Sequence, residues 1–315
     1  MWRSWTVCGA LLLAVVACSL EDSGGGLSSA SPDSGTGGTV VNSDASLGGS
    51  SGAGGLGGSS GAGGSAGAGG QSGSGGGATG GSAGSVADAS PDATTGRVTA
   101  GLQLLYEFDD ASGSKVKDTG PGKAYDLTIA DVGNVTWGSG VLTVNSETRI
   151  ENPAQPKKVL DECKKSKAFS MEAWVTPKNT TQGGHARVFS NSKGQYDRNF
   201  ALMQMDNSWG VRMRTSTNIS GTPEIQTPLG TVSTNVTHLV FTRAANGASG
   251  FYVDGVAIKN NILSGDFSNW DASYGFLLGN EFVDSRPWVG SYHLVAIYCA
   301  ALSAAEVALN FAAGP

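Results

Sequence analysis

A long segment rich in Gly, Ser and Ala limits how much of this chain can fold. From Ser19 to about Thr95 it has no aromatic residue and no Lys or Arg, and LGGSSGAGG occurs twice in succession, at 47–55 and 56–64. Such a composition buries too little apolar surface to offset the entropy cost of ordering the backbone. Gly does not keep a strict period of three, which excludes a collagen helix. We therefore expect residues 18–96 to be a disordered tether and residues 97–315 to be the folded domain.

The N-terminus has the features of an export signal. Arg3 precedes a short apolar run at residues 10–16, and a run of that length does not span a bilayer as a stable helix. It continues into Val15-Val16-Ala17-Cys18, which resembles the lipobox of bacterial lipoproteins. The resemblance implies a signal peptide at residues 1–17 and a lipid-modified Cys18, whose acyl chains would anchor the protein to a membrane without spanning it. Ordinary cleavage after Ala14 or Ala17 is the alternative.

The lipobox resemblance also implies a location. In the sorting rule of enteric bacteria, an Asp after the lipidated cysteine favours the inner membrane, whereas this chain has Ser19. We expect a lipid-anchored protein of the cell envelope, in the outer membrane where the host has one. Whether it faces the periplasm or the outside is left open.

Two cysteines remain after signal-peptide removal and lipidation, Cys163 and Cys299. In an exported, oxidising setting an even pair most simply forms a disulfide. Two buried free thiols are the alternative. Neither cysteine has a His nearby in the sequence, and two thiols alone make a poor zinc site, so we expect no metal there.

The charge pattern argues against nucleic-acid binding. Residues 97–315 hold 20 acidic and 19 basic residues, so the domain is close to neutral. The single Lys-rich stretch, at 157–167, also contains Asp161 and Glu162 and has no aromatic residue to stack on a base. We expect this stretch to be a solvated loop face rather than a nucleic-acid site.

The domain has the pattern of a β-protein. Short apolar segments separated by turn residues occur at 102–108, 125–130, 141–144, 169–175, 187–190, 200–205, 210–214, 238–243, 250–259, 274–278 and 292–298. Asp254-Gly255 predicts a type I′ hairpin turn, because both residue types tolerate positive φ. Ser303 to Glu306 forms a capping box, with Leu302 and Val307 placed as a hydrophobic staple, and predicts one short C-terminal helix. Strands at this spacing predict an all-β, two-sheet antiparallel sandwich.

Several of these segments, in this order, resemble one family. They are LLYEFDD at 104–110, FSMEAWVTP at 169–177, HLVFT at 238–242, FYVDG at 251–255 and YCAALSAAEV at 298–307. Together they resemble the laminin-G-like jelly rolls of the concanavalin A-like lectin and glucanase superfamily over about residues 101–311. The resemblance implies a jelly-roll fold. Relatives often use an Asp in the last strand for a structural Ca²⁺, but this chain has His293 at that position. A neutral imidazole is a poor ligand for a hard cation, so we expect no cofactor.

The pattern does not favour enzyme chemistry. Glycosidases on this fold carry alternating carboxylates on one strand, since a period of two places them on one face. Glu107 and Asp109 are the nearest match, but position 111 is Ala, and Glu281 and Asp284 lie in an expected loop. We therefore expect no catalytic residues.

Recognition of a ligand is the remaining class of function. Trp270 and Tyr274 lie in a polar loop, and Trp209 follows a turn-like segment. Aromatic rings stack on sugar rings, and neighbouring polar groups hydrogen-bond the hydroxyls; the polar candidates are Asn269, Asp271, Asn280 and Arg286. The alternative is that these aromatic rings belong to the hydrophobic core. We expect a non-catalytic binding or adhesion module for carbohydrate or a surface glycoprotein, with a degenerate glycan-active enzyme or a purely structural envelope protein as alternatives.

Overall fold

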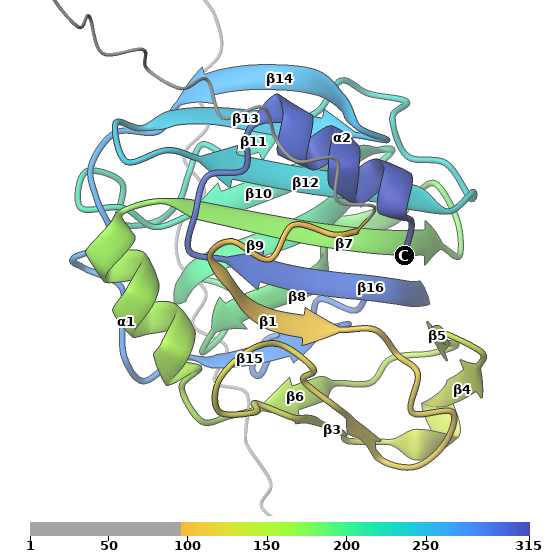
Figure 1. Cartoon of the computed structure of the whole chain (residues 1–315). Coiled ribbons are helices and arrows are strands. Elements are labelled where there is room, and N and C mark those ends of the chain that lie inside the picture. The colour runs from red at the N-terminus through yellow and green to blue at the C-terminus, as the bar shows by residue number, and fades with distance from the viewer. Residues whose placement is uncertain (1–95) are drawn as a thin grey trace, which may run out of the picture. The chain divides into compact units, whose positions relative to one another are not determined.

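The computed structural model describes residues 96–315, which form two antiparallel β-sheets packed face to face (Figure 1). The prediction of an all-β, two-sheet sandwich consistent with a jelly roll is confirmed. The predicted signal peptide and tether, including Cys18, lie outside the described residues. Neither of the two described helices has the length and apolar character needed to cross a membrane.

Sheet A is the first of the two layers and contains eight strands. In spatial order it contains β14 (Val256–Ile262), β13 (Ala248–Val253), β12 (Thr237–Arg243), β7 (Phe169–Pro177), β16 (Gly290–Tyr298), β5 (Val141–Val144) and β4 (Val135–Gly138), with β1 (Leu102–Tyr106) also paired to β16. A short 3₁₀ helix, Val132–Asn134, precedes β4.

Sheet B is the second layer. In spatial order it contains β11 (Ile225–Gln226), β10 (Ser208–Met213), β9 (Arg198–Asp206), β8 (Gln182–Ser192), β15 (Gly275–Leu278), β6 (Ile150–Asn152), β3 (Leu127–Ile129) and β2 (Lys115–Val116). Strands distant in sequence are neighbours in both sheets, for example β7 between β12 and β16. Such non-local pairing fixes which loops meet at each end of the sandwich.

The hydrophobic core lies between the two sheets. Alternate side chains of each strand point into it, because successive residues of a β-strand face opposite sides of the sheet. Phe169 of β7 and Phe200 of β9 meet there with ring centroids 4.8 Å apart. The other faces, turned away from the core, are the outer faces of sheets A and B.

The predicted hairpin turn is confirmed. Asp254 and Gly255 have φ values of 49° and 76° and connect β13 to β14. A Cβ on Gly255 would also lie 3.1 Å from the Phe311 ring, so this position has both a conformational and a steric reason to be Gly.

Helix α2 (Ala304–Ala313) confirms the predicted C-terminal helix, and the capping box between Ser303 and Glu306 is present. It lies across the outer face of sheet A (Figure 1). Leu302 and Val307 are buried there in a second hydrophobic cluster with Trp174. This helix explains why β12 is buried on both faces.

Helix α1 (Lys157–Ser166) corrects the expectation of a loop at 157–167. Its N-cap is Pro156, which has no side chain able to cap the helix, so the usual start signal is missing from the sequence. Three side chains on one face of the helix, those of Val159, Leu160 and Cys163, are buried. The helix is therefore held by packing rather than by a cap.

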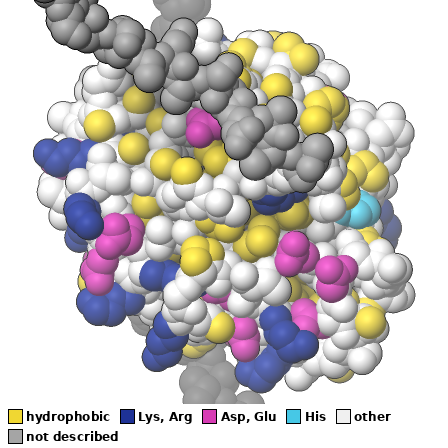
Figure 2. Space-filling view, in the orientation of Figure 1, with side chains coloured by type: hydrophobic (Ala, Val, Ile, Leu, Met, Phe, Trp, Pro, Cys, Tyr) yellow, Lys and Arg dark blue, Asp and Glu magenta, His cyan; other side chains and the backbone are white. Residues whose placement is uncertain are grey.

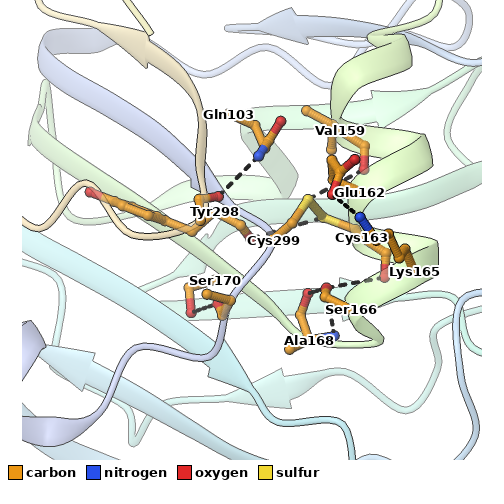
Figure 3. Close-up of a disulfide and its surroundings, with 12 residues drawn as sticks. Gln103, Val159, Glu162, Cys163, Lys165, Ser166, Ala168, Ser170, Tyr298 and Cys299 are labelled. Carbon is orange, nitrogen blue, oxygen red and sulfur yellow. Dashed lines mark hydrogen bonds and ion pairs between the residues drawn. A yellow bond between two sulfur atoms is a disulfide. The ribbon is translucent and has the colours of Figure 1, made fainter. Parts of the chain in front are cut away.

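The disulfide between Cys163 and Cys299 is confirmed, with a Cα–Cα distance of 4.5 Å. Figure 3 shows the bond joining α1 to the residue that follows β16. It fixes the helix against the end of sheet A.

Candidate functional site

The structure places the two predicted ligand-binding tryptophans in the core. Trp270 is 3% exposed, its ring packs 5.6 Å from that of Phe169, and its Nε1 donates to the Arg214 carbonyl at 2.8 Å. Trp209 is fully buried. The expectation of loop rings open to a sugar is wrong for both, and the alternative, that they belong to the core, is correct.

The other residues of that loop order the loop itself. Asn269 donates to the Thr215 carbonyl at 2.8 Å, and Asp271 accepts from both the amide and the hydroxyl of Ser273. These hydrogen bonds lower the pKa of Asp271. Tyr274 is buried, with the Arg214 guanidinium 5.7 Å from its ring centroid. Their polar groups are thus largely engaged within the protein.

Asn280 and Arg286 lie together in a different loop, between β15 and β16. The Asn280 Oδ1 accepts from the amides of Glu281 and Arg286 at 2.8 and 2.6 Å. The Arg286 carbonyl in turn accepts from the Arg187 amide of β8 at 2.9 Å. Asn280 therefore folds this loop back onto sheet B.

Arg187 lies on the outer face of sheet B, since its neighbours Ala186 and Val188 belong to the core. Its Nε donates to the Glu281 Oε1 at 2.5 Å, and both side chains are almost completely buried. The Ser192 hydroxyl donates to the other Glu281 oxygen at 2.5 Å. A buried ion pair of this kind persists only when its remaining hydrogen-bonding groups are satisfied.

Arg198 is a second arginine on this face, because it pairs in register with Ser192. It is 3% exposed, and its side chain donates one hydrogen bond among the described residues, from Nη1 to the Ser220 carbonyl at 3.4 Å. Its Nε has no hydrogen-bond partner among the described residues, and none of the salt bridges within 96–315 includes it. Burial, with the cations of Arg187 and Arg212, lowers its pKa to about 10. The guanidinium therefore stays charged at neutral pH, and Glu281 and Asp197 favour its charged form from beyond ion-pair distance.

The turn between β8 and β9 lies beside these arginines. Gln195 accepts from Arg187 through its carbonyl, at 3.4 Å, and from Arg286 through its side-chain oxygen. The next residue, Tyr196, is 75% exposed. We call this group the arginine site; it consists of Arg187, Arg198, Arg286, Glu281, Gln195 and Tyr196.

A further cation borders the arginine site on β10. Arg212 lies within hydrogen-bond distance of the His185 Nε2, at 3.0 Å, and of Glu224, at 3.3 Å. Burial and the Arg212 charge lower the pKa of His185, although Glu224 opposes the change. The imidazole is therefore neutral at pH 7, and Glu224 balances Arg212.

The sequence analysis did not predict most residues of the arginine site. Arg187 and Arg198 lie in different strands, and only the pairing of β8 with β9 brings them to the same face of the sheet. Tyr196 carried a usable signal, since it is an aromatic residue in a polar turn. Arg286 and Asn280 were predicted, but the partners that the structure gives them were not.

The carboxylates considered for catalysis make structural contacts. Glu107 accepts from the Thr119 hydroxyl at 2.7 Å, next to an ion pair between Asp110 and Lys117. Both oxygens of Glu281 are used by Arg187 and Ser192, as described above. Glu107 and Glu281 are thus bonded to hydroxyl and guanidinium groups of the domain.

The residues present do not fit the calcium site of the resembled family. His293 is half-buried in β16, where its Nε2 lies 2.9 Å from the Thr176 hydroxyl. No group of three or more His, Cys, Asp or Glu side chains in the described part of the chain is placed to hold a metal ion.

Solved structures share the fold at low sequence identity. A Trypanosoma rangeli sialidase in complex with sialic acid is 18% identical, with a TM-score of 0.50, and the match covers 67% of this chain and 32% of that one. The binding domain of botulinum neurotoxin serotype D/C is 10% identical, with a TM-score of 0.50 and coverage of 67% and 51%. A structure of botulinum neurotoxin type C, whose cell entry depends on two ganglioside molecules, is 9% identical, with the same TM-score and coverage. The chain thus spans about a third to a half of these proteins.

Sequence comparison points to the same fold. No curated protein matches the chain. The family model described as the concanavalin A-like lectin/glucanases superfamily matches residues 153–308, which include β7 to β16 and both cysteines of the disulfide. Residues 153–308 are therefore similar to the domains of the concanavalin A-like lectin/glucanases superfamily.

Proposed function

We propose that this protein is a non-catalytic carbohydrate-binding module anchored to the cell envelope, and that it binds its ligand at the arginine site. The observation that carries the proposal is Tyr196, whose side chain is 75% exposed in the turn where Gln195 accepts from Arg286. An exposed ring covers the apolar face of a sugar, while amide and guanidinium groups beside it donate to hydroxyl oxygens. The other large aromatic side chains considered for this role are in the core.

The fold supports this proposal. Lectins and glycan-active enzymes occur in the superfamily named by its description. Among the similar structures, a sialidase holds sialic acid and a neurotoxin depends on gangliosides for cell entry. A shared fold does not determine a ligand, so the proposal rests on the site and the fold is only consistent with it.

The contacts of Arg97 and Val98 favour the outer face of sheet B as the face that is left open to a ligand. Arg97 forms an ion pair with Glu172 and donates to the Gly314 carbonyl, and the Val98 amide donates to Asn310 at 2.8 Å. These contacts hold the start of the domain on the outer face of sheet A, the side that carries α2. We propose that a lipid on Cys18, in the outer membrane where the host has one, anchors the chain through this side.

The face that carries α2 is less suited to a ligand. In the part of this side that Figure 2 leaves uncovered, acidic and basic side chains lie next to one another in the lower half of the view. Its central polar groups, those of Glu172, His238 and Asn310, are buried and bonded to one another. The proposal therefore assigns a structural role to this face.

A glycan array probed with the purified protein tests the proposed function. We expect binding to a defined subset of glycans and no cleavage of any glycan that binds, as checked by chromatography of the products. Cleavage of a bound glycan would show that the protein is a glycan-active enzyme on the same fold rather than a binding module. If no glycan on the array binds, carbohydrate binding is excluded and the alternative of a structural envelope protein is favoured.

A further inference from the structure

The arginine site has more positive charge than its own carboxylates neutralise. Arg187 is matched by Glu281, and the neighbouring Arg212 is matched by Glu224. Arg198 and Arg286 have no carboxylate partner within salt-bridge distance in the described part of the chain. Glu281 and Asp197 act on the Arg198 charge only from beyond ion-pair distance, so these two cations lack a carboxylate in direct contact.

Arg198 is costly for the domain unless something compensates it. Moving a guanidinium out of water requires several hydrogen bonds or an opposite charge. The buried Arg243 shows what a structural arginine looks like here: it donates to the carbonyls of Leu263, Lys167 and Gly265 and lies 4.8 Å from the Phe267 ring centroid. Arg198 has one carbonyl at 3.4 Å and an unpartnered Nε. Its position is not explained by the packing of the domain.

The turn between β8 and β9 connects Tyr196 to both arginines. Gln195 accepts from Arg286, and Arg198 follows Tyr196 by two residues. Asp197, which is exposed, is the acidic residue in the same turn, and Asp284 is exposed in the loop that carries Arg286. These two carboxylates are free to turn toward water, whereas Arg198 is 3% exposed.

We propose that the ligand of the arginine site is an acidic saccharide, whose carboxylate or sulfate group pairs with Arg286 and is further attracted by the buried charge of Arg198. This inference rests on the proposed function. The planar guanidinium matches the two oxygens of an oxyanion and forms stronger hydrogen bonds with it than with a neutral hydroxyl. The sugar ring that carries the oxyanion then lies against Tyr196.

The test compares binding of the purified protein to three polymers, a polyuronate, a sulfated polysaccharide and a neutral polysaccharide. We expect at least one acidic polymer to bind about tenfold more tightly than the neutral one, and the carboxylate and sulfate polymers show which oxyanion is preferred. Higher salt should weaken this binding, because the charges are partly solvated.

Three variants test the residues. Arg286→Gln and Arg198→Gln should each lower affinity for the acidic polymer about tenfold, and Arg286→Lys should lower it less, because it keeps the charge without the planar fork. Lys165→Gln is the matched control: it removes the same charge from an exposed position on α1 and should leave affinity unchanged. The unfolding midpoint of each variant, measured in parallel, identifies any loss of affinity caused by misfolding. If Arg198→Gln is misfolded, the affinity of Arg286→Gln decides the test.

The outcomes separate this inference from the proposed function. Equal binding of neutral and acidic polymers, or full affinity in folded Arg286→Gln, overturns the acidic ligand and leaves carbohydrate binding standing. Absence of binding to every saccharide overturns both.

Discussion

The Nε2 of His238 lies 2.9 Å from the Oε1 of Glu172, and both side chains are fully buried on the outer face of sheet A. The second Glu172 oxygen accepts from the Tyr298 hydroxyl at 3.0 Å and from Asn310 at 2.7 Å. Arg97 completes the group. One carboxylate thus ties β7 to β12, β16, α2 and the segment that precedes β1.

The first prediction concerns the pH dependence of stability. Burial by itself would raise the pKa of Glu172, but the hydrogen bonds and charges of His238 and Arg97 outweigh it and hold the pKa below the usual 4.5. A carboxyl with a depressed folded-state pKa contributes stability above its unfolded pKa, and this contribution is lost as pH falls through the folded value. Glu172→Gln should cost about 3 kcal/mol at pH 7, and its deficit against wild type should shrink below pH 4.5.

Urea unfolding of both proteins from pH 7 to pH 3 measures this deficit. Glu162→Gln, at an exposed position of α1, is the control and should follow wild type throughout. A deficit that stays constant across the whole range would show that Glu172 acts through packing rather than charge.

The second prediction concerns the disulfide. Cys163 and Cys299 are 136 residues apart, and a cross-link of this span contributes about 4–5 kcal/mol in the chain-entropy model. The double variant Cys163→Ala/Cys299→Ala, and wild type in reducing agent, should both unfold at a lower midpoint than the oxidised protein. Alkylation of either cysteine in unreduced, denatured protein would contradict the bond.

The third prediction concerns Trp270, now that it is known to lie in the core. Its ring packs against Phe169, Phe200 and Phe267, so Trp270→Ala should lower the free energy of unfolding by about 3–5 kcal/mol. Denaturant unfolding measures the loss. A variant with the wild-type midpoint would mean that the ring is dispensable for packing.

Trp270 also shows where local pattern stops being informative. Its neighbours Asn269 and Asp271 are polar, which is typical of an exposed loop, yet they bond to backbone and turn groups while the ring between them turns inward. The hairpin at Asp254 and the capping box at Ser303 were predictable because each depends on residues adjacent in sequence. Contacts between Arg187 and Glu281, 94 residues apart, depend on strand order, which local pattern does not encode.

The fourth prediction concerns the anchor. If Cys18 is lipidated, wild-type protein should enter the detergent phase on phase separation and Cys18→Ala should stay in the aqueous phase, because several acyl chains give far more membrane affinity than one. Mass spectrometry of the mature N-terminus identifies the modification. A free thiol or an N-terminus other than residue 18 in the wild-type protein would exclude this anchor.

The last prediction separates recognition from packing at the arginine site. Tyr196→Ala should weaken saccharide binding by about 1–2 kcal/mol, the scale of a lost aromatic contact. Because the side chain is 75% exposed, the unfolding midpoint should stay at the wild-type value, in contrast to Trp270→Ala. Tyr196→Phe keeps the ring and removes the hydroxyl, so it should retain the affinity if stacking on the sugar is the main contact. If Tyr196→Ala instead binds like wild type while Arg286→Gln does not, the ligand is held by its charge alone and the ring has no part in recognition.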